Sequence, residues 1–206
     1  MSKGYFITFE GGDGSGKSTQ ITKLKEHLEE KGYHVILTRE PGGTNISEKI
    51  RDIILDSANM EMSDMTETLL YAAARAQLVQ QVIKPAVERG TIVICDRFVD
   101  SSMAYQAYGR GLGDVVWEIN QKAIGDCIPD LTILLKLDPQ KGMGRISNRE
   151  QDRIELASSD FHRRVYEGYL ALEKRFPERI KGLDASQEID VIAREIAAMV
   201  DDLIEG

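Results

Sequence analysis

The sequence reads FEGGDGSGKST from Phe9 to Thr19, and this stretch decides the fold class. Within it, Gly11–Ser18 fits the pattern GxxxxGK[ST], which forms a phosphate-binding loop when a strand precedes it and a helix follows. The strand-like run Tyr5–Glu10 lies directly before this loop, and the helix-length stretch Lys17–Lys31 lies directly after it. A glycine-rich turn without a ligand is the alternative, and the flanking strand and helix argue against it.

The residue types in the loop suit a nucleoside triphosphate. Its glycines let successive backbone amides approach phosphate oxygens at the positive end of a helix. Lys17 would add a positive charge near the β and γ phosphates, and the Ser18 hydroxyl would bind Mg²⁺, which prefers oxygen ligands. Magnesium-bound ATP is therefore the expected first ligand. The residues expected to contact it are Gly11, Gly12, Asp13, Gly14, Ser15, Gly16, Lys17, Ser18 and Thr19.

Strands and helices alternate along the rest of the chain. Further strand-like runs lie at Val35–Thr38, Thr91–Cys95, Leu131–Leu137 and Ile180–Leu183. Helix-length stretches lie at Ile46–Leu55, Thr66–Arg89 (interrupted near Pro85), Asp114–Gly125, Ser158–Phe176 and Ile189–Ile204. This alternation predicts an α/β fold with a doubly wound, five-stranded parallel sheet covered by helices on both faces. Nothing marks a domain boundary, so we expect a single domain over residues 1–206.

Composition excludes several classes of protein. The chain is 42% hydrophobic, which can supply a core without disulfides, and its two cysteines are too few for a disulfide framework. With 34 acidic and 26 basic residues the formal net charge is −8, so nucleic acid is not expected as a main ligand. There is no run of about 18 apolar residues and no secretory signal pattern. We therefore expect no membrane contact and a cytoplasmic location.

Charged residues follow the second and third strand-like runs. Arg39–Thr44 reads REPGGT, and Asp96–Phe98 reads DRF, both at positions where ligands bind in open α/β sheets. A kinase needs such a second site to hold the phosphate acceptor in line with the transferred group. The chain has no Asn-Lys-x-Asp run, as a regulatory GTPase would, and no apolar run ending in Asp-Glu, as motor ATPases often have. A small-molecule kinase is the favoured hypothesis, with a deoxynucleoside kinase and a nucleotide-switched binding module as alternatives.

Five motifs together resemble a known family. FEGGDGSGKST, TREPGGT, YAAARAQLV, DRFVDSSMAYQ and QDRIE, in this order and spacing, are similar to the thymidylate kinase (dTMP kinase) family in its bacterial form. The resemblance extends from Phe6 to about Glu155, which is most of the chain. It implies the P-loop nucleoside monophosphate kinase fold and the reaction of Mg-ATP with dTMP to give ADP and dTDP. It also implies a homodimer.

The resemblance assigns residues to the acceptor's phosphate and to the metal. Arg39 and Arg97 would grip the 5′-phosphate, because a guanidinium offers paired donors to phosphate oxygens. Arg51 would join them, and Glu40 belongs to the same REPGGT run. Asp96 matches the family's carboxylate near Mg²⁺, so that Ser18 and Asp96 form the expected metal site.

The resemblance also assigns the contacts to sugar and base. Asp13 would contact the 3′-hydroxyl, and Tyr105 would crowd a ribose 2′-hydroxyl. Arg75 would bond an exocyclic oxygen of the base, with Ser102 and Gln106 as further base contacts. Two positions depart from the family pattern: Tyr71 replaces the usual stacking Phe, and Gly14 stands where some members carry an arginine.

The missing loop arginine must therefore come from elsewhere. Lys141, Arg145, Arg149 and Arg153 recur every four residues, which would form one basic stripe if the segment is helical. This segment, at about residues 142–155, resembles the family's lid over ATP. We expect Arg149 and Arg153 to reach the transferred phosphate together with Lys17 and Arg97, and Arg145 to lie on the stem.

Overall fold

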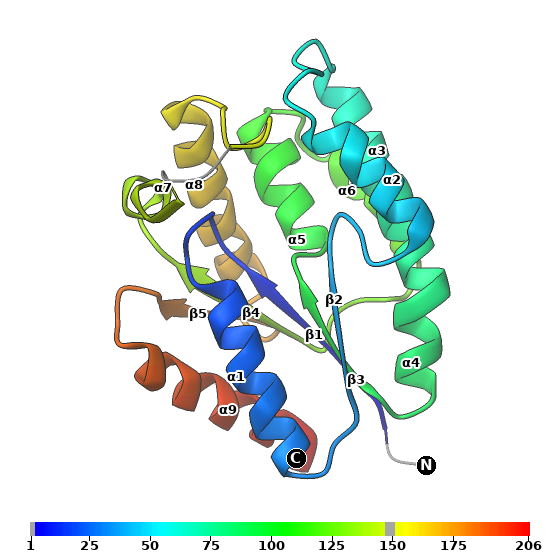
Figure 1. Ribbon diagram of the computed structural model, residues 1–206, viewed down its shortest axis with the longest axis vertical. Coiled ribbons are helices and arrows are strands. Elements are labelled where there is room, and N and C mark those ends of the chain that lie inside the picture. The colour runs from blue at the N-terminus through cyan, green and yellow to red at the C-terminus, as the bar shows by residue number, and fades with distance from the viewer. Residues whose placement is uncertain (1–2, 147–150) are drawn as a thin grey trace.

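A five-stranded sheet forms the centre of the computed structural model, which describes residues 3–146 and 151–206 (Figure 1). The strands are β1 (Tyr5–Glu10), β2 (Val35–Arg39), β3 (Ile92–Asp96), β4 (Leu131–Lys136) and β5 (Ile180–Asp184). Their order is β2-β3-β1-β4-β5, and every neighbouring pair is parallel. The predicted fold class, a doubly wound five-stranded parallel sheet, is confirmed.

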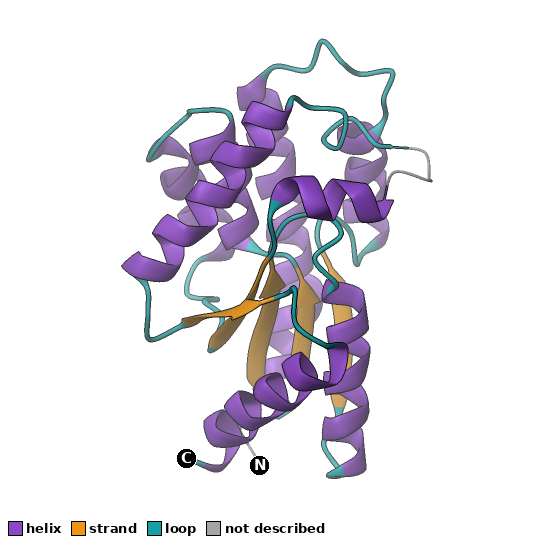
Figure 2. Ribbon diagram, turned by 90° about the vertical axis from the view of Figure 1, so that its left-hand side faces the viewer, coloured by secondary structure: helices purple, strands orange, loops and turns teal. Residues whose placement is uncertain are grey.

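Helices cover both faces of this sheet (Figure 2). One face carries α1 (Lys17–Glu30) and α9 (Ile189–Glu205), which pack on each other. The other carries α3 (Asp64–Leu78), η1 (Val79–Ile83), α4 (Lys84–Glu88), α5 (Val99–Ser102), η2 (Met103–Gly109), α6 (Val115–Ile124) and α8 (Ser159–Arg175). Outside these layers, α2 (Asn45–Leu55) packs on α3, and α7 (Pro139–Ile146) follows β4. No helix of the described chain has the length and apolar character that crossing a membrane requires.

Alternate residues of the strands pack into apolar clusters on both faces of the sheet. Ile7 and Ile133 pack beneath α1 and α9, whereas Phe6 and Val93 pack against the helices of the other face. Because both faces of a parallel sheet are buried, its strands read as almost continuous apolar runs in the sequence.

The strand order directs the functional loops to one place. The connection after β1 leads to β2 on one side of the sheet, and the connection after β3 leads past β1 to β4 on the other side. Such a reversal opens a crevice at the carboxyl ends of the strands. Both chain ends lie at the opposite, amino end of the sheet (Figure 1).

Three helical segments differ from the expectation. The predicted helix Thr66–Arg89 is divided into α3, the π-helical η1 and α4, and the irregular part begins before Pro85. The helical run formed by α5 and η2 was not predicted, because VDSSMAYQAYG is buried almost all round and so shows no amphipathic period. α7 overlaps the start of the predicted lid segment at about residues 142–155, and no separate helix was expected there, because Gly142 and Gly144 lower its helix propensity.

Truncating a core leucine tests this packing. Leu28 of α1 is completely buried against the sheet, so Leu28→Ala should lower the free energy of unfolding by about 2–5 kcal/mol. Leu156 is half exposed, and Leu156→Ala should change that free energy by about 0.5 kcal/mol or less. Urea unfolding followed by circular dichroism measures both, and equal losses would contradict the assigned core.

Candidate functional site

The phosphate-binding loop connects β1 to α1. Gly16 caps α1 with a left-handed backbone (φ 91°), and no side chain caps the first turn of the helix. The amide groups of that turn are therefore available to an anion. The Lys17 ammonium donates to the carbonyl oxygens of Gly11 and Gly12, both at 3.1 Å. Burial, and then the nearby Arg97, lower the pKa of Lys17 to about 8.

Arg97 lies beside Lys17. Its Nη1 donates to the same Gly11 carbonyl oxygen at 3.0 Å, and its Nη2 lies 2.6 Å from Asp13 Oδ1. The backbone of Arg97 is left-handed (φ 68°), which is costly for a residue with a Cβ and turns its side chain toward the loop. Two cations thus converge on one carbonyl group, and a phosphate would relieve their repulsion.

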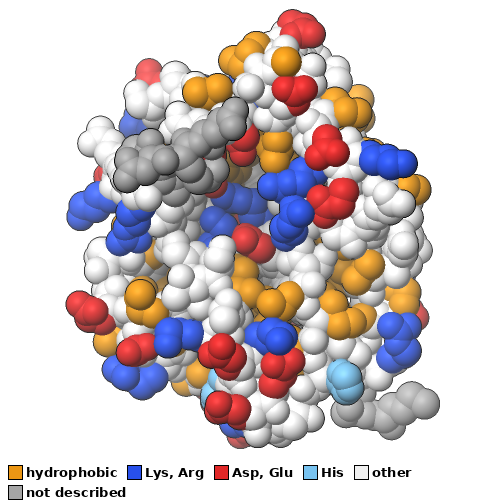
Figure 3. All heavy atoms as spheres, viewed as in Figure 1, with side chains coloured by type: hydrophobic (Ala, Val, Ile, Leu, Met, Phe, Trp, Pro, Cys, Tyr) orange, Lys and Arg blue, Asp and Glu red, His pale blue; other side chains and the backbone are white. Residues whose placement is uncertain are grey.

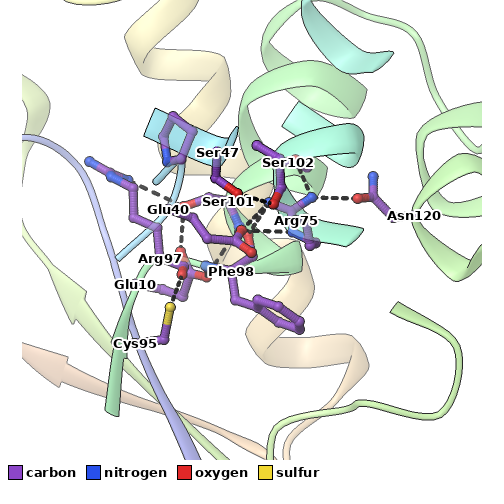
Figure 4. Close-up of polar contacts among 12 residues, drawn as sticks. Glu10, Glu40, Ser47, Arg75, Cys95, Arg97, Phe98, Ser101, Ser102 and Asn120 are labelled. Carbon is purple, nitrogen blue, oxygen red and sulfur yellow. Dashed lines mark hydrogen bonds and ion pairs between the residues drawn. The ribbon is translucent and has the colours of Figure 1, made fainter. Parts of the chain in front are cut away.

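A buried glutamate holds the turn that carries Arg97. Glu10 accepts hydrogen bonds from the Phe98 amide (2.8 Å), the Ser101 hydroxyl (2.6 Å) and the Tyr169 hydroxyl (3.0 Å). Figure 4 shows it beneath Arg97 and Ser101. Burial, with a smaller contribution from Asp100, raises the pKa of Glu10 to about 7. Sequence reasoning missed this support, because it depends on contacts among β1, α5 and α8.

A cavity of about 200 Å³ lies next to Arg97. It is lined by the expected acceptor-site residues Asp13, Glu40, Arg51, Tyr71, Arg75, Arg97, Ser102, Tyr105 and Gln106. Further lining residues, which the sequence analysis did not single out, are Pro41, Leu55, Ser101, Asp152, Ile154 and Glu155. Charged side chains of both signs gather around a hollow in the upper half of the molecule (Figure 3). Residues far apart in the sequence therefore share one cavity.

The three arginines expected at the acceptor phosphate do not all reach this cavity. Arg97 and Arg51 line it, and Arg51 donates to the Pro41 carbonyl oxygen at 2.8 Å, next to the cis Glu40–Pro41 peptide. Arg39 does not line the cavity: its side chain is 49% exposed, and its Nη2 lies 3.0 Å from Glu48 Oε2. The structure thus does not bring Arg39 to the site, because Glu48 of α2 holds its guanidinium at the surface.

Arg75 lines the cavity and is 1% exposed. Its Nε donates to Glu40 Oε2 at 2.7 Å, and its Nη2 donates to the Phe98 carbonyl oxygen at 3.0 Å. Its Nη1 donates to Ser102 Oγ at 2.9 Å and to Asn120 Oδ1 (Figure 4). All three nitrogens are thus engaged within the protein, so the guanidinium forms a fixed part of the wall.

Two tyrosines and an aspartate, Tyr71, Tyr105 and Asp13, also line the cavity. The Tyr105 hydroxyl donates to Asp13 Oδ2 at 3.3 Å, and the Arg97 guanidinium lies 5.2 Å from the centre of the Tyr105 ring. Burial favours the neutral form of Asp13, but Arg97 and Lys17 outweigh it and hold the pKa of Asp13 below its usual value. Tyr71 lines the same cavity from α3, and burial raises the pKa of its hydroxyl.

The residues expected to hold a metal fit a magnesium–phosphate complex. Ser18 lies exposed in the first turn of α1, and Asp96 ends β3, near enough to Lys17 to interact with its charge. Asp96 Oδ1 is buried and accepts no hydrogen bond from the described chain. No group of three His, Cys, Asp or Glu side chains there could hold an ion unaided. Mg²⁺ needs only one or two protein oxygens when phosphates and water supply the rest.

The four basic residues expected to form one stripe do not share a helix, because Arg153 lies in a turn outside α7. Arg145, which was expected on the stem, lies against the phosphate loop, and its Nη1 donates to the Gly14 carbonyl oxygen at 3.1 Å. Arg153, which was expected at the transferred phosphate, is 4% exposed and donates to Glu67 Oε2 (2.7 Å) and to the Ile54 carbonyl oxygen (2.8 Å). Arg149 lies outside the described residues.

Comparison with known proteins places the chain in a family. The thymidylate kinase family model matches residues 9–196. A thymidylate kinase of Geobacillus sp. is 53% identical over 99% of this chain and 99% of its own, and one of Oceanobacillus iheyensis is 51% identical over 96% and 89%. The crystal structure of thymidylate kinase from Ehrlichia chaffeensis superimposes with a TM-score of 0.80 at 33% identity, covering 97% of this chain and 99% of its own. The chain therefore belongs to the thymidylate kinase family and is a nucleoside monophosphate kinase.

Proposed function

We propose that the chain transfers the γ-phosphoryl group of Mg-ATP to dTMP, giving ADP and dTDP for dTTP synthesis. One observation carries this proposal: Lys17 and Arg97 donate to the same Gly11 carbonyl oxygen, and the acceptor cavity lies on the Arg97 side. The two cations therefore lie between the triphosphate loop and the acceptor. Positioning and charge stabilisation at that point are what phosphoryl transfer requires.

On the triphosphate side, the residues of the loop Gly11–Thr19 bind the phosphates of ATP through the backbone and through Lys17. Ser18 and Asp96 would hold Mg²⁺, which supplies charge neutralisation at the phosphate oxygens when it is bound. Arg97 faces the transferred group, and Glu10 keeps the backbone that presents it in place.

On the acceptor side, the positions of the lining residues support one orientation of dTMP. Its phosphate would lie toward Arg97 and Arg51, and its sugar beside Asp13 and Tyr105. The base would lie among Tyr71, Arg75, Ser102 and Gln106, and would be stacked on the Tyr71 ring. Arg39 is a lesser contributor in this proposal, because its guanidinium is paired with Glu48.

The α7 segment closes over the phosphate loop in this proposal. The backbones of Gly14 and Gly142 lie against each other. A Cβ added to Gly142 would lie 2.2 Å from the Asp13 carbonyl oxygen, and a Cβ added to Gly14 would lie 2.2 Å from the Gly142 carbonyl oxygen. The absence of side chains at both positions lets Arg145 reach the loop. Arg145 is therefore a candidate for the charge at the transferred phosphate, with Arg149 still a prediction from the sequence. Arg153 is not a candidate for this position, because it is buried and paired with Glu67.

The homodimer and the cytoplasmic location stay predictions. Support for the dimer comes from α2 and α3, which pack on each other and expose Ile46, Ile53, Met65 and Leu69. Exposed apolar side chains on two packed helices suit a subunit contact. Sedimentation equilibrium of the wild type and of Ile53→Lys would test the dimer.

Dependence of ATP turnover on the acceptor tests the proposed function. We expect ADP release to need an acceptor and to rank dTMP first among dTMP, dUMP, dCMP, dAMP and dGMP. dUMP lacks one methyl group, so its kcat/KM should fall by only about 10- to 200-fold. Turnover that ignores the acceptor would favour a nucleotide-switched module, and faster turnover with thymidine than with dTMP would favour a deoxynucleoside kinase.

Paired arginine variants test the orientation of the acceptor. Arg97→Ala should lower kcat/KM for dTMP by about 100-fold, because it removes a charged group from the transferred phosphate. Arg39→Ala serves as the control and should cost about tenfold or less, since this side chain is half exposed and paired with Glu48. Steady-state kinetics at saturating ATP would show this difference, and equal losses would contradict the placement of Arg39 outside the cavity.

A glycine variant tests the contact between α7 and the phosphate loop. Gly142→Ala should lower kcat at least about tenfold, because its methyl group would meet the Asp13 carbonyl. Gln140→Ala changes an exposed residue of the same helix and serves as the control, so kcat should stay within about twofold of wild type. Similar rates for the two variants would show that closure of α7 does not limit turnover.

A further inference from the structure

Glu67 of α3 lies completely buried behind the cavity wall and does not line the cavity itself. Its Oε1 accepts from Gln106 Nε2 at 2.8 Å and from Arg110 Nε at 3.2 Å. Its Oε2 accepts from Arg110 Nη2 at 2.9 Å and from Arg153 Nη2 at 2.7 Å. One carboxylate therefore joins α3, η2 and the segment that follows residue 150.

The charge state of Glu67 determines the orientation of the Gln106 side-chain amide. Burial favours the protonated form of Glu67, but hydrogen bonds from Arg110, Gln106 and Arg153 outweigh it and hold the pKa of Glu67 below its usual value. An ionised carboxylate can only accept hydrogen bonds, so Gln106 must turn its NH₂ group toward it. Gln106 lines the cavity, and its Oε1 accepts no hydrogen bond from the described residues. The amide therefore offers its carbonyl oxygen to a ligand.

The neighbouring Ser102 offers the opposite polarity. Its oxygen accepts from Arg75 Nη1 at 2.9 Å, and no group within residues 3–146 and 151–206 accepts its proton. Its hydroxyl can therefore donate to a ligand. A donor and an acceptor thus lie on the same wall, and they complement a ring in which a carbonyl adjoins an N–H. Thymine and uracil have that arrangement at C4 and N3, whereas cytosine reverses both polarities.

We propose that Glu67 is a positioning residue that sets the base selectivity of the site. By fixing the Gln106 amide with its carbonyl oxygen toward the cavity, it makes the site accept pyrimidines whose N3 carries a hydrogen and reject those whose N3 is an acceptor. This inference rests on the proposed function, because it assumes that a nucleotide base binds in the cavity next to Ser102 and Gln106. Arg110 and Arg153 act with Glu67, since they keep it ionised.

The substitution Glu67→Gln tests the inference, with dTMP and 5-methyl-dCMP as the two acceptors. These nucleotides share the methyl group and differ only at N3 and C4. We expect wild type to prefer dTMP at least about 1000-fold in kcat/KM, because a mismatch leaves buried polar groups unpaired. A glutamine at position 67 can donate as well as accept, so Gln106 can turn over. The preference should then fall at least about tenfold, through KM for the acceptors and not through KM for ATP.

Two control variants separate selectivity from stability. Asp100→Asn removes the charge of another buried carboxylate, which pairs with Arg179 and does not line the cavity. It should lower the melting temperature without changing the preference between the two acceptors. Glu67→Asp keeps an acceptor-only carboxylate and should keep most of the preference for dTMP. If Glu67→Gln slows both acceptors by the same factor, so that their ratio is unchanged, Glu67 is only structural and the inference is wrong.

A measurement on the wild type keeps the inference testable if Glu67→Gln does not fold. The side-chain NH₂ protons of Gln106, observed by NMR, should exchange slowly with water both before and after dTMP is added, because Glu67 accepts from this group in either case. Exchange that is fast in the free protein and slows only with dTMP would mean that the NH₂ group faces the ligand, which would overturn the inference. Turnover of dTMP by wild type tests the proposed function separately.

Discussion

The site depends on one carbonyl oxygen, that of Gly11, to which both Lys17 and Arg97 donate. Two cations close to one acceptor repel each other, and Arg97 contributes to the lowered pKa of Lys17. An anion between them would stabilise both. The fold therefore places two positive charges where a negatively charged phosphoryl group would bind. Because the molecule as a whole has a net charge of −8, this concentration of positive charge is a local property of the sheet edge.

A second constraint is that buried glutamates hold the groups that face the cavity. Glu10 anchors the turn that presents Arg97, Glu40 pairs with Arg75, and Glu67 holds Gln106. Each glutamate is at most 5% exposed. Each accepts hydrogen bonds from residues on other parts of the fold than its own. Losing one partner of such a buried pair is expensive, which keeps the ligand-facing groups in fixed positions. In this account, the specificity of the site depends in part on Glu10 and Glu67, which do not line the cavity.

The sequence predicted the sheet and most of the cavity for a simple reason. Residues just after parallel strands meet at one edge, so the loop at Gly11, the run at Glu40 and the turn at Arg97 were expected to lie together, and they do. The expectations for Arg39 and Arg153 depended on side-chain direction, which spacing does not determine. Glu48 keeps Arg39 outside the cavity, and Glu67 holds Arg153 behind it.

Other residues escaped prediction because their signal is tertiary. Glu10, Ser101 and Tyr169 come from β1, α5 and α8, and nothing in their separate stretches of sequence connects them. Asp152 and Glu155 could have been singled out from the sequence, since they belong to the QDRIE motif. Only the structure shows that they line the cavity.

The convergence of Lys17 and Arg97 is tested most directly by a double-mutant cycle. kcat/KM for dTMP would be measured by ADP release for wild type, Lys17→Met, Arg97→Met and the double variant. If both side chains act on the same transferred group, the loss in the double variant should be at least about tenfold smaller than the product of the two single losses. A loss equal to that product would mean that the two cations act independently, and would contradict this account of the site.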